Sequence, residues 1–89
     1  MFTGIIEDTG RIAHVEARGG GKRLTIEAAF APELRVDQSV SINGACQTVV
    51  DVDADARTFA VDTIEETLRK TTFSTLSAGT PVNLERALQ

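Results

Sequence analysis

The stretch Ser39–Val50 constrains the fold of this chain more than any other. Small polar and apolar residues alternate up to Asn43-Gly44, and a second run then carries the only cysteine and ends in β-branched residues. Asn-Gly tolerates the positive φ angles of a type I′ turn, which fits the twist of two antiparallel strands. The pattern therefore predicts a β-hairpin. The hairpin gathers short polar side chains suited to hydrogen-bonding a small polar molecule, namely Ser39, Ser41, Cys46, Gln47 and Thr48.

The rest of the chain continues in short strand-like runs. Apolar and polar residues alternate with a period of two, which is typical of half-buried strands, in Leu24–Ala28, Thr58–Asp62 and Val82–Arg86. The N-terminal stretch predicts one bent strand or two short ones, with Gly4 and Gly10 where the backbone bulges or is approached closely. About six strands at this spacing indicate an all-β sandwich or barrel. Because a small open sheet leaves costly edges, we expect a closed barrel with any ligand at its mouth.

One or two short helices accompany these strands. Pro32-Glu33-Leu34 fits a single helical turn, since proline is tolerated at a helix start. Thr63-Ile64-Glu65-Glu66 has the form of a capping box, in which the first and last side chains each bond a backbone N–H. We expect a short helix over about Ile64–Lys70 to follow and to cap one end of the barrel.

Composition narrows the classes of protein. The 89 residues, 42% of them hydrophobic and 25% charged, predict one globular domain over residues 1–89. A net charge of -4 with scattered basic residues argues against nucleic acid as a partner. The chain has neither a run of ~20 apolar residues nor a basic-then-apolar leader, so we expect a cytoplasmic protein without a membrane partner. One cysteine and one histidine exclude an intrachain disulfide and a zinc site with the usual four ligands.

Four blocks of the sequence, taken in order, resemble the N-terminal half of riboflavin synthase. They are Met-Phe-Thr-Gly-Ile-Ile-Glu at 1–7, Ser-Val-Ser-Ile-Asn-Gly-Ala-Cys-Gln-Thr-Val at 39–49, Glu-Thr-Leu-Arg at 66–69 and Val-Asn-Leu-Glu-Arg-Ala at 82–87. The resemblance implies a six-stranded antiparallel Greek-key β-barrel that binds 6,7-dimethyl-8-ribityllumazine or riboflavin. Riboflavin synthases join two such barrels in one chain and need no metal or redox cofactor. Two lumazines, held face to face between adjacent barrels, exchange a four-carbon unit and give riboflavin and a pyrimidinedione.

The resemblance also implies which residues meet the ligand. Those expected at the ring system are Gly4, Ile5 and Ile6; those expected to offer hydrogen bonds are Cys46, Gln47 and Thr48; those expected at the ring edge and ribityl chain are Asp62, Thr63, Ile64, Glu65, Glu66 and Thr67. Positions linked in the family to the reaction itself are Phe2, Ser39 and Cys46. A site that pairs the ribityl hydroxyls rejects analogues lacking them. Proton removal from an acidic methyl group and nucleophilic addition suit a held hydroxyl, thiol or water.

Two departures from the family bear on catalysis. Gln47 stands where the family usually has leucine, and its side chain either adds a ligand contact or faces solvent. The family's second barrel contributes histidines to the composite active site. The single histidine here, His14, matches none of them. It lies in the first strand region and is expected at the surface. We therefore expect this chain alone to be weakly active or inactive as a synthase.

Three functions stay open. The first is a flavin- or lumazine-binding module, either an excised domain or a natural single-barrel protein. The second is a homodimeric single-barrel riboflavin synthase with residual catalysis, and the third is a β-barrel adaptor that has lost the ligand. We expect two copies to pair in either of the first two cases, because the surface that meets a second barrel would otherwise be an exposed apolar patch. Without the family context, the sequence favours Cys46 as a small buried residue over a nucleophile. Ser39 and Thr48 are then ordinary strand residues, and Glu66 is a capping residue only.

Overall fold

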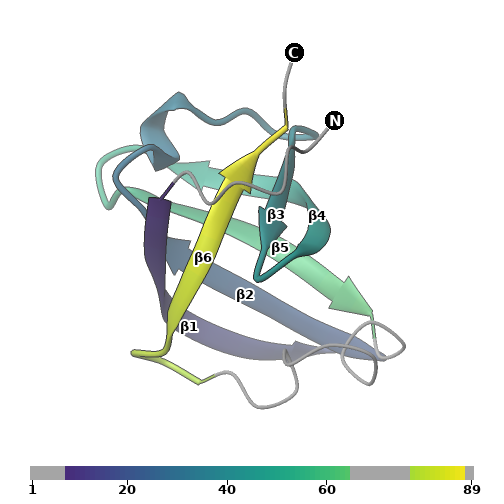
Figure 1. Ribbon diagram of the computed structural model, residues 1–89. Coiled ribbons are helices and arrows are strands. Elements are labelled where there is room, and N and C mark those ends of the chain that lie inside the picture. Colours follow the sequence, from purple (N-terminus) through teal and green to yellow (C-terminus); the bar gives the residue numbers. More distant parts are fainter. Residues whose placement is uncertain (1–7, 65–76, 88–89) are drawn as a thin grey trace.

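The computed structural model describes residues 8–64 and 77–87. Its elements are β1 (Asp8–Arg18), β2 (Gly21–Glu27), the 3-10 turn η1 (Ala31–Glu33), β3 (Ser39–Ile42), β4 (Ala45–Asp53), β5 (Thr58–Ile64) and β6 (Pro81–Arg86) (Figure 1). The strands close a barrel in the order β1-β2-β5-β4-β3-β6, and each pair of neighbours is antiparallel. The predicted six-stranded antiparallel barrel is confirmed.

The order of the strands makes a Greek key. Strands β3, β4 and β5 follow one another as neighbours, whereas β2 lies beside β5 and not beside β3. Three hairpin-connected strands with a fourth that returns by a longer link define this motif. The link from β2 to β3 passes through η1 and crosses one end of the barrel (Figure 1).

The hairpin of β3 and β4 forms as the Asn-Gly sequence predicts. Asn43 and Gly44 have φ angles of 51° and 87°, both positive as a type I′ turn requires. The strands pair from Ser39–Thr48 to Ile42–Ala45. The Asn43 side chain has a second role, since its Oδ1 accepts a hydrogen bond from the backbone N–H of Asn83 at 2.8 Å. This contact fastens the turn to β6.

Alternating apolar side chains fill the barrel interior. The largest fully buried ones come from β1 to β6 and include Ile12, Leu24, Ile26, Val40, Ile42, Val49, Phe59, Val61, Val82 and Leu84. The strand prediction that placed Phe59 and Val61 on one face is confirmed by their burial. The barrel is thus a packed core, so a ligand has to bind at an end of the barrel or on its outer surface.

β1 is one bent strand over its described length. Its first residues pair with β6, from Asp8–Leu84 to Arg11–Pro81, and the rest pairs with β2, with a register shift between Ile12 and His14. Gly10 lies where the strand approaches its neighbours: a Cβ atom there would be 2.7 Å from the carbonyl oxygen of Glu27 and 2.7 Å from Cδ1 of Leu84. The close approach predicted at Gly10 is confirmed, whereas Gly4 lies outside the described residues.

The two helical predictions have different outcomes. The turn at Pro32 is confirmed as η1. The prediction that the strand ends at Asp62 and a helix starts at Thr63 is wrong for Thr63 and Ile64, which continue β5 and pair with β2. Thr63 is 3% exposed and its hydroxyl donates to the carbonyl oxygen of Lys22 at 3.2 Å, so it serves the barrel rather than a helix cap. The remainder of the expected helix lies outside the described residues.

Across residues 8–64 and 77–87, no helix has the length and apolar character needed to cross a bilayer.

Candidate functional site

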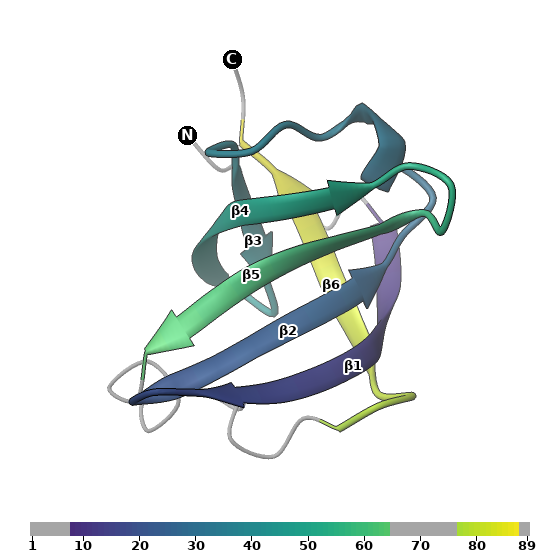
Figure 2. The same ribbon diagram turned by 180° about the vertical axis from the view of Figure 1, so that it is seen from behind.

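Two of the predicted ligand-binding stretches lie at the same end of the barrel, where β4 and β5 separate. The pairing of β4 with β5 runs from Val49–Val61 to Asp53–Thr58. Because the strands are antiparallel, the residues before Val49 and those after Val61 extend from this pair in the same direction. The first set is 46–48 and the second is 62–64, and both lie at the same end of the β4–β5 pair (Figure 2).

Short polar side chains gather on the outer face of the β3–β4 hairpin beside this point. Ser39 is paired with Thr48, and Ser41 with Cys46, so these four residues form two neighbouring rows on one face. Cys46 and Thr48 are exposed, Ser39 is half-buried, and Ser41 is buried. The alternative reading of Cys46 as a buried hydrophobe is therefore wrong, because its thiol is free and exposed. We call Ser39, Ser41, Cys46 and Thr48 the polar face.

Gln47 points the other way, into the barrel. It is 7% exposed and is paired with the fully buried Val40. Of the two roles considered for this side chain, facing solvent is wrong. The Gln47 carboxamide has no hydrogen-bond partner among the described residues. Every fully buried side-chain nitrogen or oxygen of those residues does have a partner, so the carboxamide is not fully buried. The carboxamide therefore keeps a small contact with solvent, at the end of the β4–β5 pair that holds residues 46–48.

Asp62 is held by a side chain that sequence patterns did not single out. Arg23 of β2 is paired with Asp62 of β5, its Nε–H donates to Oδ1 at 2.8 Å, and its Nη2–H donates to Oδ2 at 3.0 Å. Hydrogen bonding to Asp62 raises the pKa of the Arg23 guanidinium above its ordinary value. The period-two pattern places both residues on the outer face, but they are 39 residues apart, and only the strand order makes them neighbours.

Seven predicted site residues lie outside the described residues: Phe2, Gly4, Ile5, Ile6, Glu65, Glu66 and Thr67. Their roles stay predictions. His14 is exposed on β1, as expected. Within the described part of the chain, no group of three or more histidine, cysteine, aspartate or glutamate side chains is arranged to hold a metal ion.

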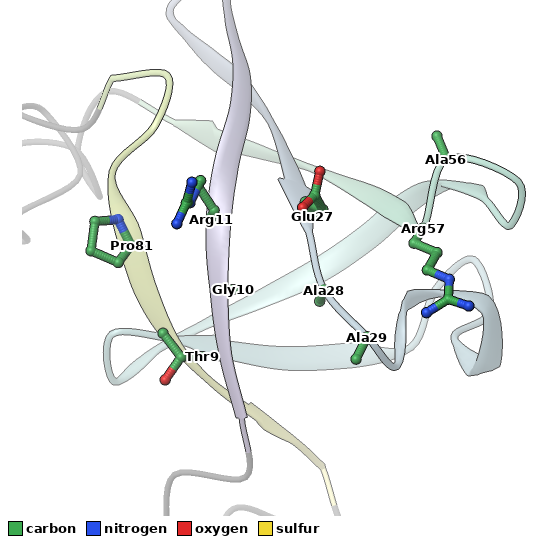
Figure 3. A pocket seen from close by; sticks show the side chains of 9 residues that line it. All are labelled: Thr9, Gly10, Arg11, Glu27, Ala28, Ala29, Ala56, Arg57 and Pro81. Carbon is green, nitrogen blue, oxygen red and sulfur yellow. The ribbon is translucent and has the colours of Figure 1, made fainter.

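A surface hollow of about 510 Å³ lies elsewhere on the barrel (Figure 3). It is lined by Thr9, Gly10, Arg11, Glu27, Ala28, Ala29, Ala56, Arg57 and Pro81, none of which is a predicted ligand residue. Glu27 is paired with Thr58 at the start of β5, so the hollow is at the opposite end of β5 from Asp62. Arg11 and Arg57 lie on either side of Glu27, and their charges do not converge (Figure 3). We therefore place the candidate site at the end of the barrel that holds 46–48 and 62–64.

Comparisons with known proteins agree on one family. The model of the family described as "Lumazine binding domain" matches residues 3–87. The chain is 42% identical over 93 residues to riboflavin synthase of Brucella abortus, covering 100% of this chain and 46% of that protein. It is 39% identical over 89 residues to the Bacillus subtilis enzyme, covering 99% of this chain and 40% of that protein. The chain thus spans less than half the length of these curated relatives.

Solved structures give the same answer for the fold. LumP complexed with 6,7-dimethyl-8-(1'-D-ribityl) lumazine superposes with a TM-score of 0.86 at 28% identity, over 98% of this chain and 49% of that one. LumP complexed with riboflavin superposes with a TM-score of 0.85 at 28% identity, over 97% of this chain and 46% of that one. By sequence across residues 3–87 and by fold across nearly its whole length, this chain belongs to the lumazine-binding domain family.

Proposed function

We propose that this chain binds 6,7-dimethyl-8-ribityllumazine and riboflavin at the end of the barrel where β4 and β5 separate, beside residues 46–48 and 62–64. The observation that carries the proposal is that both stretches lie at the end of the barrel where β4 and β5 separate, in a chain whose fold matches LumP in complex with each of these compounds. Two stretches chosen for ligand contact are far apart in sequence, yet both extend from the Val49–Val61 pair on the same side. A flat ring with a polyhydroxyl chain would contact both.

The chemistry of the polar face supports a ligand rich in hydroxyl groups. Ser39, Ser41 and Thr48 each carry a hydroxyl that donates and accepts, and the Cys46 thiol lies among them. Such groups can pair several ribityl hydroxyls at once, and a site built this way discriminates against analogues that lack the chain. The ion pair of Arg23 with Asp62 holds the Asp62 side chain in one orientation at this end of β5.

We further propose that a synthase reaction needs a second barrel, so that this chain alone is weakly active or inactive. The riboflavin synthases it resembles are more than twice its length, and the family resemblance implies two barrels that together hold the two lumazines. Pairing of two copies of this chain would supply the second site. Sedimentation at high protein concentration tests the pairing: a dimer is expected, and a monomer throughout would contradict it.

Ligand binding is tested by titrating riboflavin with the protein and following flavin fluorescence. The lumazine is titrated in parallel, and lumichrome, which lacks the ribityl chain, is the control. Saturable binding of riboflavin at micromolar or tighter affinity, weaker for lumichrome, is the expected result. No binding at high protein concentration would contradict the proposal and favour a barrel that has kept the fold without the ligand. Riboflavin formed from lumazine alone would reveal catalysis.

A further inference from the structure

Arg23 is the centre of a charged row that crosses three strands on the outside of the barrel. It is paired with Glu16 of β1 on one side and with Asp62 of β5 on the other. β2 lies between these strands, so an arginine is flanked by two acidic residues at the same height. Cross-strand neighbours on one face have their side chains within reach of each other, and opposite charges there attract.

The contact between Arg23 and Asp62 has a more specific geometry than surface charges usually have. Two N–H groups of the guanidinium each meet a different carboxylate oxygen, at 2.8 and 3.0 Å. A two-point contact of this kind fixes the direction of the carboxylate as well as its distance. The side chains are 27% and 46% exposed, and ion pairs this exposed add little to stability. A contribution to the stability of the fold therefore does not explain why this pair is so well aligned.

The position of Asp62 suggests another reason. Along β5, pairing with β4 ends at Val61, so at Asp62 the strand has left β4. Residues 62–64 are still paired with β2, at Arg23, Lys22 and Gly21. This part of β5 is thus set in place from the β2 side, by the backbone ladder, by the Thr63 hydroxyl on the carbonyl of Lys22, and by the Arg23 contact with Asp62.

We propose that Arg23 is a positioning residue for ligand binding: by holding both carboxylate oxygens of Asp62, it fixes the end of β5 where the ligand is bound. The inference rests on the proposed function and names a residue outside the predicted ligand contacts. Arg23 acts through Asp62 and need not touch the ligand. Its removal leaves the barrel core intact, because both side chains are on the outer face.

The test compares riboflavin affinity with thermal stability in a set of variants. Arg23→Gln is expected to weaken riboflavin binding by about fivefold, the order of one surface ion pair, with little change in the thermal midpoint. Arg23→Lys keeps the charge but loses the two-point contact, so an intermediate affinity is expected. Adding Arg23→Gln to Asp62→Asn should weaken binding no further than Asp62→Asn alone, because the two residues act as one unit.

A control comes from a second ion pair of the described barrel. Glu33 of η1 meets Arg86 of β6 at 3.3 Å, and η1 lies beside the opposite end of β5 (Figure 2). Glu33→Gln removes an exposed one-point ion pair away from residues 62–64 and should leave riboflavin affinity unchanged. Wild-type affinity in Arg23→Gln, or an equal loss in Glu33→Gln, would overturn the inference while leaving the proposed function standing. Absence of binding by the wild-type chain would overturn the proposed function and this inference together.

Discussion

Replacing Gln47 by leucine is predicted to stabilise the free protein. The side chain is 7% exposed, faces the same interior as Val40 and Val49, and its carboxamide has no hydrogen-bond partner within the described residues. Leaving an amide buried without a partner costs about 1–3 kcal/mol in proteins, and residual contact with solvent places this one at the lower end. Leucine has a similar volume and needs no partner, so the free energy of unfolding should rise by about 1 kcal/mol.

For a domain of this size, that gain corresponds to an increase of about 4–8 °C in the thermal midpoint. Thermal and urea unfolding followed by circular dichroism measure it. Gln38→Leu is the matched control, because the Gln38 Oε1 accepts a hydrogen bond from the backbone N–H of Arg35 at 3.0 Å and its loss should not stabilise. A lower midpoint for Gln47→Leu than for the wild type would refute the reasoning, since it would mean that the carboxamide is satisfied in the free protein.

The same variant separates stability from ligand contact. If the Gln47 carboxamide finds its hydrogen-bond partner on the ligand, Gln47→Leu should weaken riboflavin binding by about fivefold, the equivalent of one hydrogen bond of ~1 kcal/mol. Higher stability together with weaker binding is the expected pattern. Higher stability with unchanged binding would remove Gln47 from the ligand contacts.

Two glycines allow further tests of the fold. Gly10→Ala should lower the free energy of unfolding by about 1–3 kcal/mol in urea unfolding. The added Cβ would be 2.7 Å from the Glu27 carbonyl oxygen and from Cδ1 of Leu84, and wild-type stability would contradict this close approach. Gly44→Ala should cost about 1 kcal/mol, because φ is +87° and the surrounding space is open, so the penalty is conformational only. Gly20→Ala, also in open space but without a positive φ, is its control, and an equal loss in both variants would argue against the type I′ turn.

Local chemistry made the hairpin predictable from sequence. Asn43-Gly44 encodes its own turn, and the alternation on each side gives the register from Ser39–Thr48 onward. The same alternation also contains the orientation of Gln47, which is two residues before the buried Val49 and so belongs on the inner face. The polarity of the side chain favours solvent and the alternation favours the interior, so the sequence alone does not decide between them.

Features that depend on strand order were not predictable from local patterns. The capping-box pattern at Thr63 gave the wrong end for β5, because pairing with β2 extends the strand to Ile64. The partnership of Arg23 with Asp62 requires β2 and β5 to be neighbours, which no local motif encodes. The placement of 46–48 and 62–64 at the same end of the barrel follows from the register of β4 with β5, which no local motif encodes either.

The binding region can be located directly by recording backbone amide NMR spectra of the protein while riboflavin is added. Shift changes concentrated at 46–48 and 62–64 are predicted, with little change around Arg11, Ala28 and Arg57 of the surface hollow. Changes confined to the hollow, or no changes at saturating riboflavin, would contradict the placement of the ligand at the end of the barrel where β4 and β5 separate.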